Sequence, residues 1–146
     1  MYTQAPARLR GVEGSLEVAV TNTLVAAIRG DVLHARQQDG TPLSFMPPAR
    51  TGFTIRWDDG RFSLGGDAHY EFAQEHTGSA AEAPTDAHVI LRLDGGARLR
   101  IAGRVHSQSL RVDNLMNELH RESTSRIKDF ALAAGRNIAL AYRVHF

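Results

Sequence analysis

The chain has 146 residues and a mass of 16.0 kDa, which suits one domain, and its net charge of +1 offers no concentrated basic surface for nucleic acid. Cysteine is absent, which excludes a disulfide framework, a thiol nucleophile and a thiolate zinc site. The longest apolar stretches have about five residues, whereas a membrane-spanning helix needs roughly 20, and the first residues lack the apolar core of a signal peptide.

Apolar and polar residues alternate with a period of two along most of the chain, which predicts β-strands with one apolar and one polar face. In chain order, the predicted strands cover residues 7–21, 23–36, 51–57, 61–73, 88–101, 105–114 and 136–146. The pattern is weakest in 105–114, because His106 and Gln108 fall on the apolar face there. It is clearest in the last strand, whose apolar face carries Ile138, Leu140, Tyr142, Val144 and Phe146.

The connections between these strands are alternately tight and long. The tight ones contain Thr21-Asn22, Asp58-Asp59-Gly60 and Ala102-Gly103-Arg104, which suit antiparallel hairpins. The long ones cover about 37–50, 74–86 and 115–135. In an antiparallel meander this alternation places every tight turn at one end and every long loop at the other, as in transmembrane β-barrels.

Strand length and charge favour a membrane barrel over a soluble β-sandwich. The predicted strands have about 10–15 residues, long enough to span the apolar layer of a bilayer when tilted. Their polar faces carry many charges, Arg92, Arg98 and Asp67 among them, which a wet or plugged lumen accommodates better than a packed core. Aromatic residues near the strand ends predict interfacial girdles, and they are Trp57, Phe62, Tyr70 and Phe72.

The sequence pattern leaves two alternatives open. A self-contained soluble β-sheet domain that binds a ligand or partner would pack the same apolar face as its core. Locally, Val112, Leu115, Met116 and Leu119 have the spacing of an amphipathic helix over 112–122, although Asp113-Asn114 suits a strand exit and favours a strand to about residue 115.

Several short motifs resemble those of TonB-dependent receptors, the large outer-membrane transporters of Gram-negative bacteria. The motifs are, in order, Ala7 to Glu13 (ARLRGVE), Met46 to Arg50 (MPPAR), Asp113-Asn114-Leu115, Asn117-Glu118, Ser125 to Phe130 (SRIKDF), Gly135-Arg136-Asn137 and the terminal Phe146. The resemblance implies an all-β antiparallel meander of about seven long strands, the C-terminal segment of a transmembrane β-barrel, with residues 1–146 forming a single unit.

The same resemblance implies which partners the chain has. Family members have an N-terminal plug domain, a TonB-contacting box and a barrel of roughly 22 strands. We expect these 146 residues to contain neither plug nor box, and an odd strand count leaves both sheet edges for the rest of a barrel. The implied partners are outer-membrane lipid, the barrel-assembly machinery, the remaining strands and plug of the parent receptor, and TonB through that plug.

Candidate functional residues lie in the last strand and in the long loops. Ile138, Leu140, Tyr142, Val144 and Phe146 resemble the signal that the barrel-assembly machinery reads through β-augmentation. Imidazole and carboxylate groups in the loops could capture a metal ion or metal chelate, and these substrate-loop candidates are Glu75, His76, Glu118, His120 and Glu122. The alternative interpretation is that these loop side chains are exposed to water and bind no ligand.

No catalytic role or cofactor is expected. Motifs of hydrolases, nucleotide-binding loops and helical zinc sites are absent from the sequence. The resemblance to TonB-dependent receptors implies that the parent takes up a metal complex such as a ferric siderophore, or a metal ion, at the cell outer membrane. Of the 17 basic residues only Lys128 is a lysine, a bias that a GC-rich genome would produce and that an arginine-lined interior would also explain.

Overall fold

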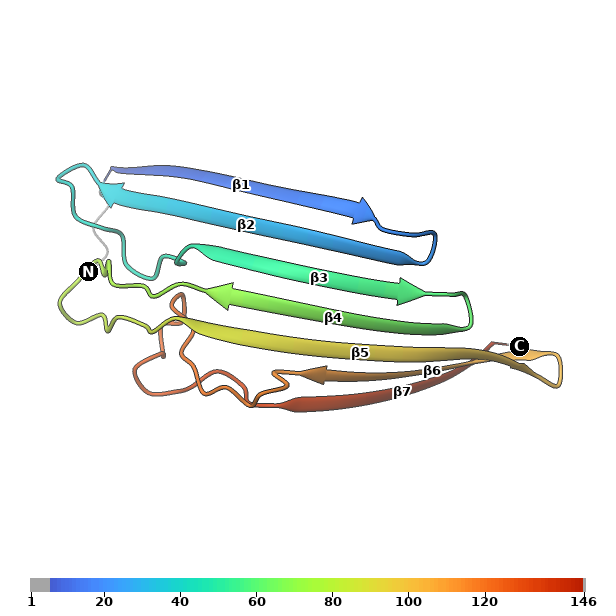
Figure 1. Cartoon of the computed structure of the whole chain (residues 1–146). Coiled ribbons are helices and arrows are strands. Elements are labelled where there is room, and N and C mark those ends of the chain that lie inside the picture. Colours follow the sequence, from blue (N-terminus) through green and yellow to red (C-terminus); the bar gives the residue numbers. More distant parts are fainter. Residues whose placement is uncertain (1–5, 146) are drawn as a thin grey trace.

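The computed structural model describes residues 6–145, which form one antiparallel sheet of seven strands in simple chain order (Figure 1). The strands are β1 (Ala7–Ala19), β2 (Leu24–Gln37), β3 (Arg50–Asp58), β4 (Phe62–Glu71), β5 (His88–Ile101), β6 (Arg104–Asp113) and β7 (Asn137–His145). Each predicted strand is found, with its ends displaced by at most two residues among those described. The predicted all-β meander is therefore confirmed.

The tight and long connections alternate as predicted, and local chemistry explains the tight ones. Ala102 and Gly103 both have positive φ, 50° and 79°, the combination that a two-residue type I′ hairpin requires. In the β3–β4 turn, Asp59 Oδ1 accepts hydrogen bonds from the backbone N–H groups of Arg61 and Phe62 at 2.8 and 2.6 Å. These turns lie at one end of the sheet and the long loops 38–49, 72–87 and 114–136 lie at the other (Figure 1).

The chain leaves β6 by a turn and not by a helix. Strand β6 ends at Asp113, and the backbone of Asn114 takes a left-handed conformation, with φ of 51°. The helix that the spacing of apolar residues allowed over 112–122 is not formed, because this reversal starts inside it. No helix in residues 6–145 is long and apolar enough to cross a membrane.

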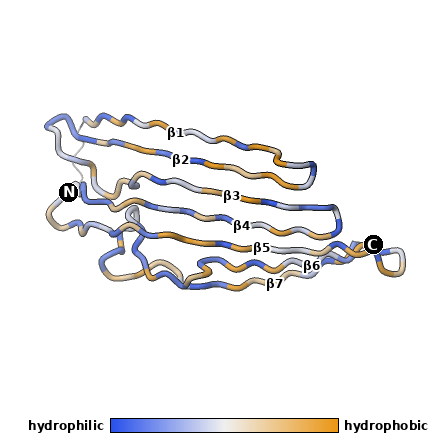
Figure 2. The backbone as a smooth tube through the Cα atoms, in the orientation of Figure 1, coloured by the Kyte–Doolittle hydropathy of each residue, from blue (hydrophilic) through white to orange (hydrophobic). Residues whose placement is uncertain are grey.

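Register places most apolar residues of the seven strands on one side of the sheet, which we call the outer face, whereas Leu33, Ile90 and Val105 lie on the other side. Leu16 pairs with Ile28 and Ile28 with Phe53, and this matching of apolar residues continues to Leu110 and Leu140 at the other edge. Figure 2 shows the resulting alternation of hydrophobic and hydrophilic residues along each strand. The outer face includes Val12, Leu16, Ile28, Val32, Phe53, Ile55, Leu64, Leu93, Leu110, Ile138 and Leu140.

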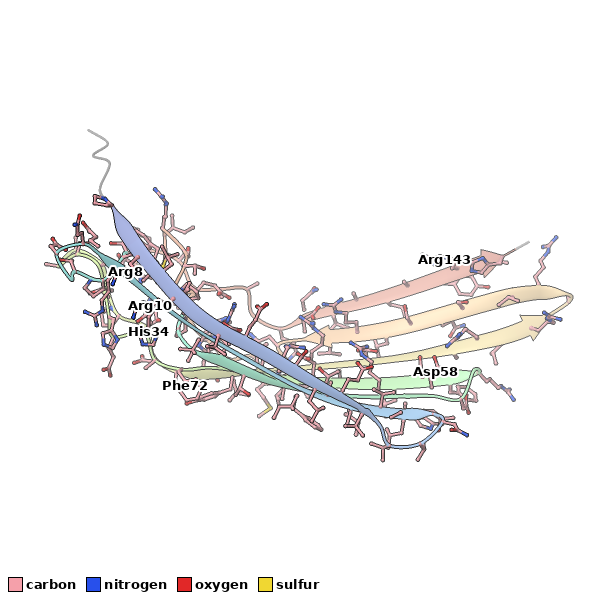
Figure 3. All side chains as sticks on the ribbon, turned by 90° about the horizontal axis from the view of Figure 1, so that it is seen from above. Arg8, Arg10, His34, Asp58, Phe72 and Arg143 are labelled. Atoms are coloured by element: carbon pink, nitrogen blue, oxygen red, sulfur yellow. The ribbon has the colours of Figure 1, made fainter. Side chains whose placement is uncertain are left out.

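Nothing in the described chain covers the outer face. Leu140 is 77% exposed and Val12 is 74% exposed. The buried hydrophobic set of residues 6–145 consists of Ala35 alone, at 7% exposure. The molecule is thus a single curved layer without a core of its own, as the view along the sheet shows (Figure 3).

Aromatic side chains lie on the outer face near both ends of the strands. Trp57 and Phe62 flank the tight β3–β4 turn, whereas Tyr70 and Phe72 lie at the long-loop end, where their rings meet edge to face at 4.7 Å. Tyr142 also lies on this face. Its hydroxyl forms a hydrogen bond with His106 Nδ1 at 2.5 Å, which gives this outer-face histidine a polar partner. Aromatic side chains thus lie on this face near both ends of the strands, which is where the two girdles were predicted.

The opposite side, which we call the inner face, carries charges in cross-strand pairs. Arg50 binds Asp31 with two nitrogens, at 3.0–3.2 Å. Arg29 reaches Asp67 at 3.1 Å, and Asp67 also accepts a hydrogen bond from Thr54 at 2.8 Å. Similar cross-strand pairs join Arg92 to Asp113 and Arg98 to Asp58, and Asp113 also binds Arg111 of its own strand. Charge neutralisation across strands lets a half-exposed inner face hold many arginines.

Candidate functional site

The three long loops meet around one buried ion pair, which we call the Glu82–Lys128 pair. Lys128 Nζ lies 3.0 Å from Glu82 Oε1, and the two side chains are only 1% and 2% exposed. Glu82 Oε1 also accepts a hydrogen bond from the backbone N–H of Phe45 at 2.8 Å, and Oε2 accepts one from Gly78 at 3.0 Å. Each of the loops 38–49, 72–87 and 114–136 therefore contributes a partner.

The environment of Glu82 favours the charged carboxylate. Burial on its own would raise the pKa of Glu82, but the Phe45 N–H, the Lys128 ammonium and the Gly78 N–H outweigh it. The pKa is consequently held below its ordinary value of 4.5. Lys128 gains a further acceptor in the Ser123 carbonyl oxygen at 3.3 Å, so both charges are paired and hydrogen-bonded.

Two asparagines close the base of the loop 114–136. Asn114, 4% exposed, donates to the carbonyl oxygens of Glu118 and Ala134 at 3.0 and 3.3 Å and accepts from the Glu118 N–H at 2.8 Å. Asn117 Oδ1 accepts from the Arg136 N–H at 2.9 Å. These bonds join the start of the loop to its end, which gives a 23-residue connection a defined shape.

The loop 114–136 also contacts the start of β5 through histidines. The rings of His88 and His120 stack with centroids 4.2 Å apart and an interplanar angle of 29°. His120 Nε2 lies 3.4 Å from Glu122 Oε1. The structure therefore brings the candidates His120 and Glu122 together, and adds His88, which sequence reasoning did not select.

The other loop candidates do not join this pair. Glu75 and His76 are exposed in the loop 72–87, where the His76 N–H donates to Gln74 Oε1 at 3.1 Å. Glu118 is exposed, and its backbone rather than its carboxylate is engaged by Asn114. In the described part of the chain, no group of three or more His, Cys, Asp or Glu residues could hold a metal ion.

The apolar side chains of β7 are presented at the edge of the sheet. Strand β7 pairs only with β6, and three of its outer-face residues, Ile138, Leu140 and Tyr142, are 58–77% exposed. Val144 lies on the same face, opposite His106. Phe146, the last member of the predicted assembly signal, lies outside the described residues.

Sequence reasoning missed the residues that organise the loops. Lys128 carried one signal, since it is the only lysine of the chain. Glu82 carried none, because its neighbours are the small and polar residues of an ordinary loop. Their contact spans 46 positions of sequence and follows no periodicity.

The arrangement of the strands has a counterpart among solved structures, although no protein-family model and no curated protein matches the chain. The copper transporter OprC, a TonB-dependent outer-membrane receptor, matches it with a TM-score of 0.81 and 18% sequence identity. The match covers 93% of this chain and 22% of that one, so the chain spans about a fifth of the transporter's length. The seven-stranded meander thus has the fold of part of a TonB-dependent receptor barrel.

Proposed function

We propose that residues 1–146 are the C-terminal part of the β-barrel of a TonB-dependent receptor in the outer membrane of a Gram-negative bacterium. The parent receptor takes up a metal complex such as a ferric siderophore, or a metal ion, and this segment contributes wall and extracellular loops, without catalysis or cofactor. Its partners are outer-membrane lipid, the remaining strands and plug of the receptor, and TonB through that plug. The motifs in the sequence and the fold shared with a copper transporter support this function.

One observation carries the proposal, namely the unequal faces of a single curved sheet. The outer face is apolar and uncovered, and bands of aromatic residues lie at both strand ends. The inner face is charged and ion-paired. A transmembrane barrel places the apolar outer face against lipid and the charged inner face against a plugged, polar lumen, so it accounts for both faces.

The same observation weighs against a self-contained soluble β-domain. Such a domain would bury the outer face under a second layer, and residues 6–145 supply none. The soluble alternative would require a dimer in which two copies bury their outer faces against each other. Its signature would be a stable, detergent-free dimer.

In this function, the last strand serves assembly and the loops serve capture. An edge strand with alternating exposed apolar residues suits β-augmentation by the barrel-assembly machinery, with Ile138, Leu140, Tyr142, Val144 and Phe146 as the signal. Glu75, His76, Glu118, His120 and Glu122 contact the arriving metal complex. The described residues hold no complete metal site, so these side chains complement ligands from other loops or from the chelator.

Cell fractionation tests the proposal. An antibody against residues 115–134 should detect the protein in the outer-membrane fraction, as a band several times larger than 16.0 kDa whose migration changes on heating. A 16.0 kDa monomer that folds cooperatively without detergent and remains in the soluble fraction would overturn it.

Uptake measurements test the role of the loops. His120→Ala should lower accumulation of radiolabelled ferric siderophore or copper while the amount of folded protein in the outer membrane is unchanged. His145→Ala, a histidine of the inner face near the tight-turn end, is the matched control. Equal uptake by wild type and His120→Ala would remove His120 from the capture surface.

A further inference from the structure

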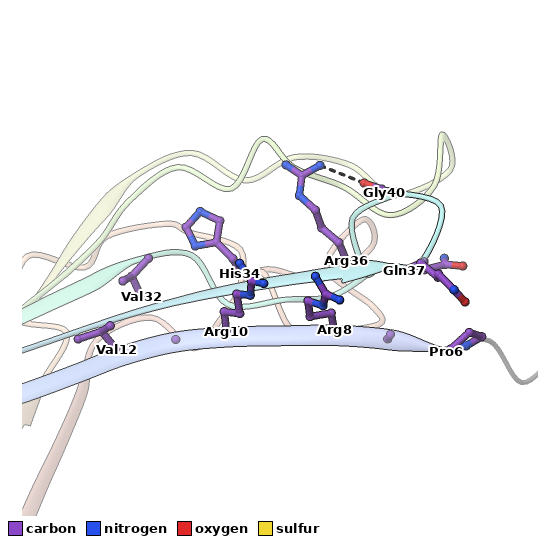
Figure 4. Close-up of a pocket in the computed structure, with 12 residues that line it drawn as sticks. Pro6, Arg8, Arg10, Val12, Val32, His34, Arg36, Gln37 and Gly40 are labelled. Atoms are coloured by element: carbon purple, nitrogen blue, oxygen red, sulfur yellow. Dashed lines mark hydrogen bonds between the residues drawn. The ribbon is translucent and has the colours of Figure 1, made fainter.

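Three arginines and a histidine interrupt the apolar outer face at one corner of the sheet. Arg8 and Arg10 lie on β1, and His34 and Arg36 lie on β2. Register pairs Arg10 with His34 and Arg8 with Arg36, on the same side of the sheet as the pair Val12–Val32 that follows. Figure 4 shows these side chains on one side of the two strands, and we call them the basic corner.

The basic corner lies at the long-loop end, beyond the aromatic girdle. Tyr70 pairs with Thr51, and Thr51 pairs with Gly30. His34 and Arg36 lie further along β2 towards the loop 38–49. In the proposed barrel, this position corresponds to the headgroup region of the extracellular leaflet.

The charges of the basic corner have no counterion within residues 6–145. None of the ion pairs of the described chain involves Arg8, Arg10, His34 or Arg36, whereas on the inner face Arg29 of β2 and Arg50 of β3 are both paired with aspartates. Arg36 donates a hydrogen bond to the Gly40 carbonyl oxygen at 3.0 Å, which holds its guanidinium at the loop end of the basic corner. Like charges directly opposite each other on paired strands are destabilising, so an anion from outside would relieve this repulsion.

The corner also has the shape of a binding site. A pocket of about 860 Å³ lies over it, and its lining includes the three arginines and His34 but no carboxylate. Val12 and Val32 form the part of the lining that faces the apolar band. Gln37 at the end of β2 and Gln38 and Gly40 of the loop 38–49 form the polar part of the lining. A ligand that fits this pocket has an anionic group opposite the arginines, a polar part towards the loop 38–49 and an apolar part over Val12 and Val32.

We propose that the basic corner binds the phosphate groups of a phosphorylated lipid headgroup in the outer leaflet. Arginine guanidinium groups recognise phosphate oxygens through paired hydrogen bonds, and acyl chains below the headgroup cover Val12 and Val32. This inference rests on the proposed function, because it needs the outer face to be in contact with lipid. A free phosphate ion would satisfy the arginines but would leave the apolar part of the pocket exposed.

The test measures lipid binding to the full-length receptor purified in dodecyl maltoside. The probes are mixed micelles with diphosphoryl lipid A, the same micelles with dephosphorylated lipid A, and inorganic phosphate alone. Arg8→Gln/Arg10→Gln/Arg36→Gln should weaken binding of the diphosphoryl lipid on the order of 100-fold, since each juxtamembrane arginine contributes about fivefold. Arg56→Gln/Arg100→Gln/Arg143→Gln, which removes the same charge from the inner face, should bind as wild type does.

Arg10→Gln alone, with an expected loss of about fivefold, keeps the test decisive if the triple variant does not fold. Equal losses in the outer-face and inner-face variants would overturn the inference, as would equal binding of the dephosphorylated lipid or full competition by inorganic phosphate. Failure of the proposed function has a different signature. The receptor would then be missing from the outer-membrane fraction, whatever lipid it binds.

Discussion

The strands and the long loops of this chain reach order by opposite means. The strands form a sheet whose apolar side chains are largely exposed, so that Leu140 is 77% exposed and Ala35 alone counts as a buried hydrophobic residue of the described chain. The loops contain an almost fully buried large side chain, and it is a charged one, Lys128 at 1% exposure. A sheet of this kind depends on its surroundings to cover one face, whereas the loops are held by polar contacts of their own.

This contrast indicates where the chain tolerates change. In the strands, the face that a side chain occupies decides which residue types are tolerated, because the outer face contacts lipid and the inner face contacts the lumen. In the loops, a single partner matters, because burial makes an unpaired charge costly. Substitutions in the two regions should therefore differ in their free-energy cost and in how much of the molecule they affect.

Lys128→Ala should have the largest effect, and it should be confined to the loops. Removing one partner of a buried ion pair costs about 3–5 kcal/mol, since the Glu82 carboxylate stays buried without its counterion. The chain has no cysteine, so a spin label on Thr124→Cys reports the mobility of the loop 114–136 directly. The label should become mobile while the folded barrel persists.

Asp129→Ala is the matched control for Lys128→Ala, since Asp129 is an exposed neighbour in the same loop. Combining Lys128→Met with Glu82→Gln should restore part of the order, because no charge is then buried. An unchanged spectrum in Lys128→Ala would show that the Glu82–Lys128 pair does not hold the loops together.

Leu140→Arg should be the most damaging single substitution in the strands. An arginine at mid-depth on the lipid face of a barrel costs about 2–4 kcal/mol. Ala139→Arg places the same side chain one residue away on the inner face, where it should cost little. Urea unfolding in phospholipid vesicles measures both, and equal midpoints would contradict the assignment of the two faces.

Acidification should loosen the loops before it affects the sheet. The pKa of Glu82 is lower in the folded protein than its ordinary value of 4.5, so the carboxylate stabilises the loops fully above about pH 4.5. That contribution is lost as the pH falls through the lowered value. The label on Thr124→Cys should therefore gain mobility only below about pH 4.5, and the transition should be absent in Glu82→Gln.

The inner-face ion pairs should show the smallest effects, graded by exposure. Asp67→Asn should cost about 1 kcal/mol, because the 15% exposed carboxylate binds both Arg29 and Thr54. Asp58→Asn should cost between about 0 and 1 kcal/mol, since that aspartate and its partner Arg98 are about half exposed. The same unfolding titration compares the two, and a larger loss in Asp58→Asn would reverse the expected order.

Much of the fold could be predicted from the sequence because a period of two is a local property. The alternation in Ile138, Leu140 and Tyr142 identifies a strand and its faces without knowledge of any neighbour. Glycine and aspartate in the tight connections similarly identify turns from two or three residues. The candidate site was predicted less well, since His120 and Glu122 are brought together but His76 is not.

The amino-acid pattern alone was enough to define the seven strands, the alternation of tight turns with long loops, and the apolar side of the sheet. Three features depended on the folded chain: Glu82 meets Lys128, His88 stacks on His120, and the outer-face arginines of β1 and β2 gather at one corner. The faces of a strand follow from the geometry of that strand, whereas these contacts depend on the register between strands and on loop paths that no local pattern encodes.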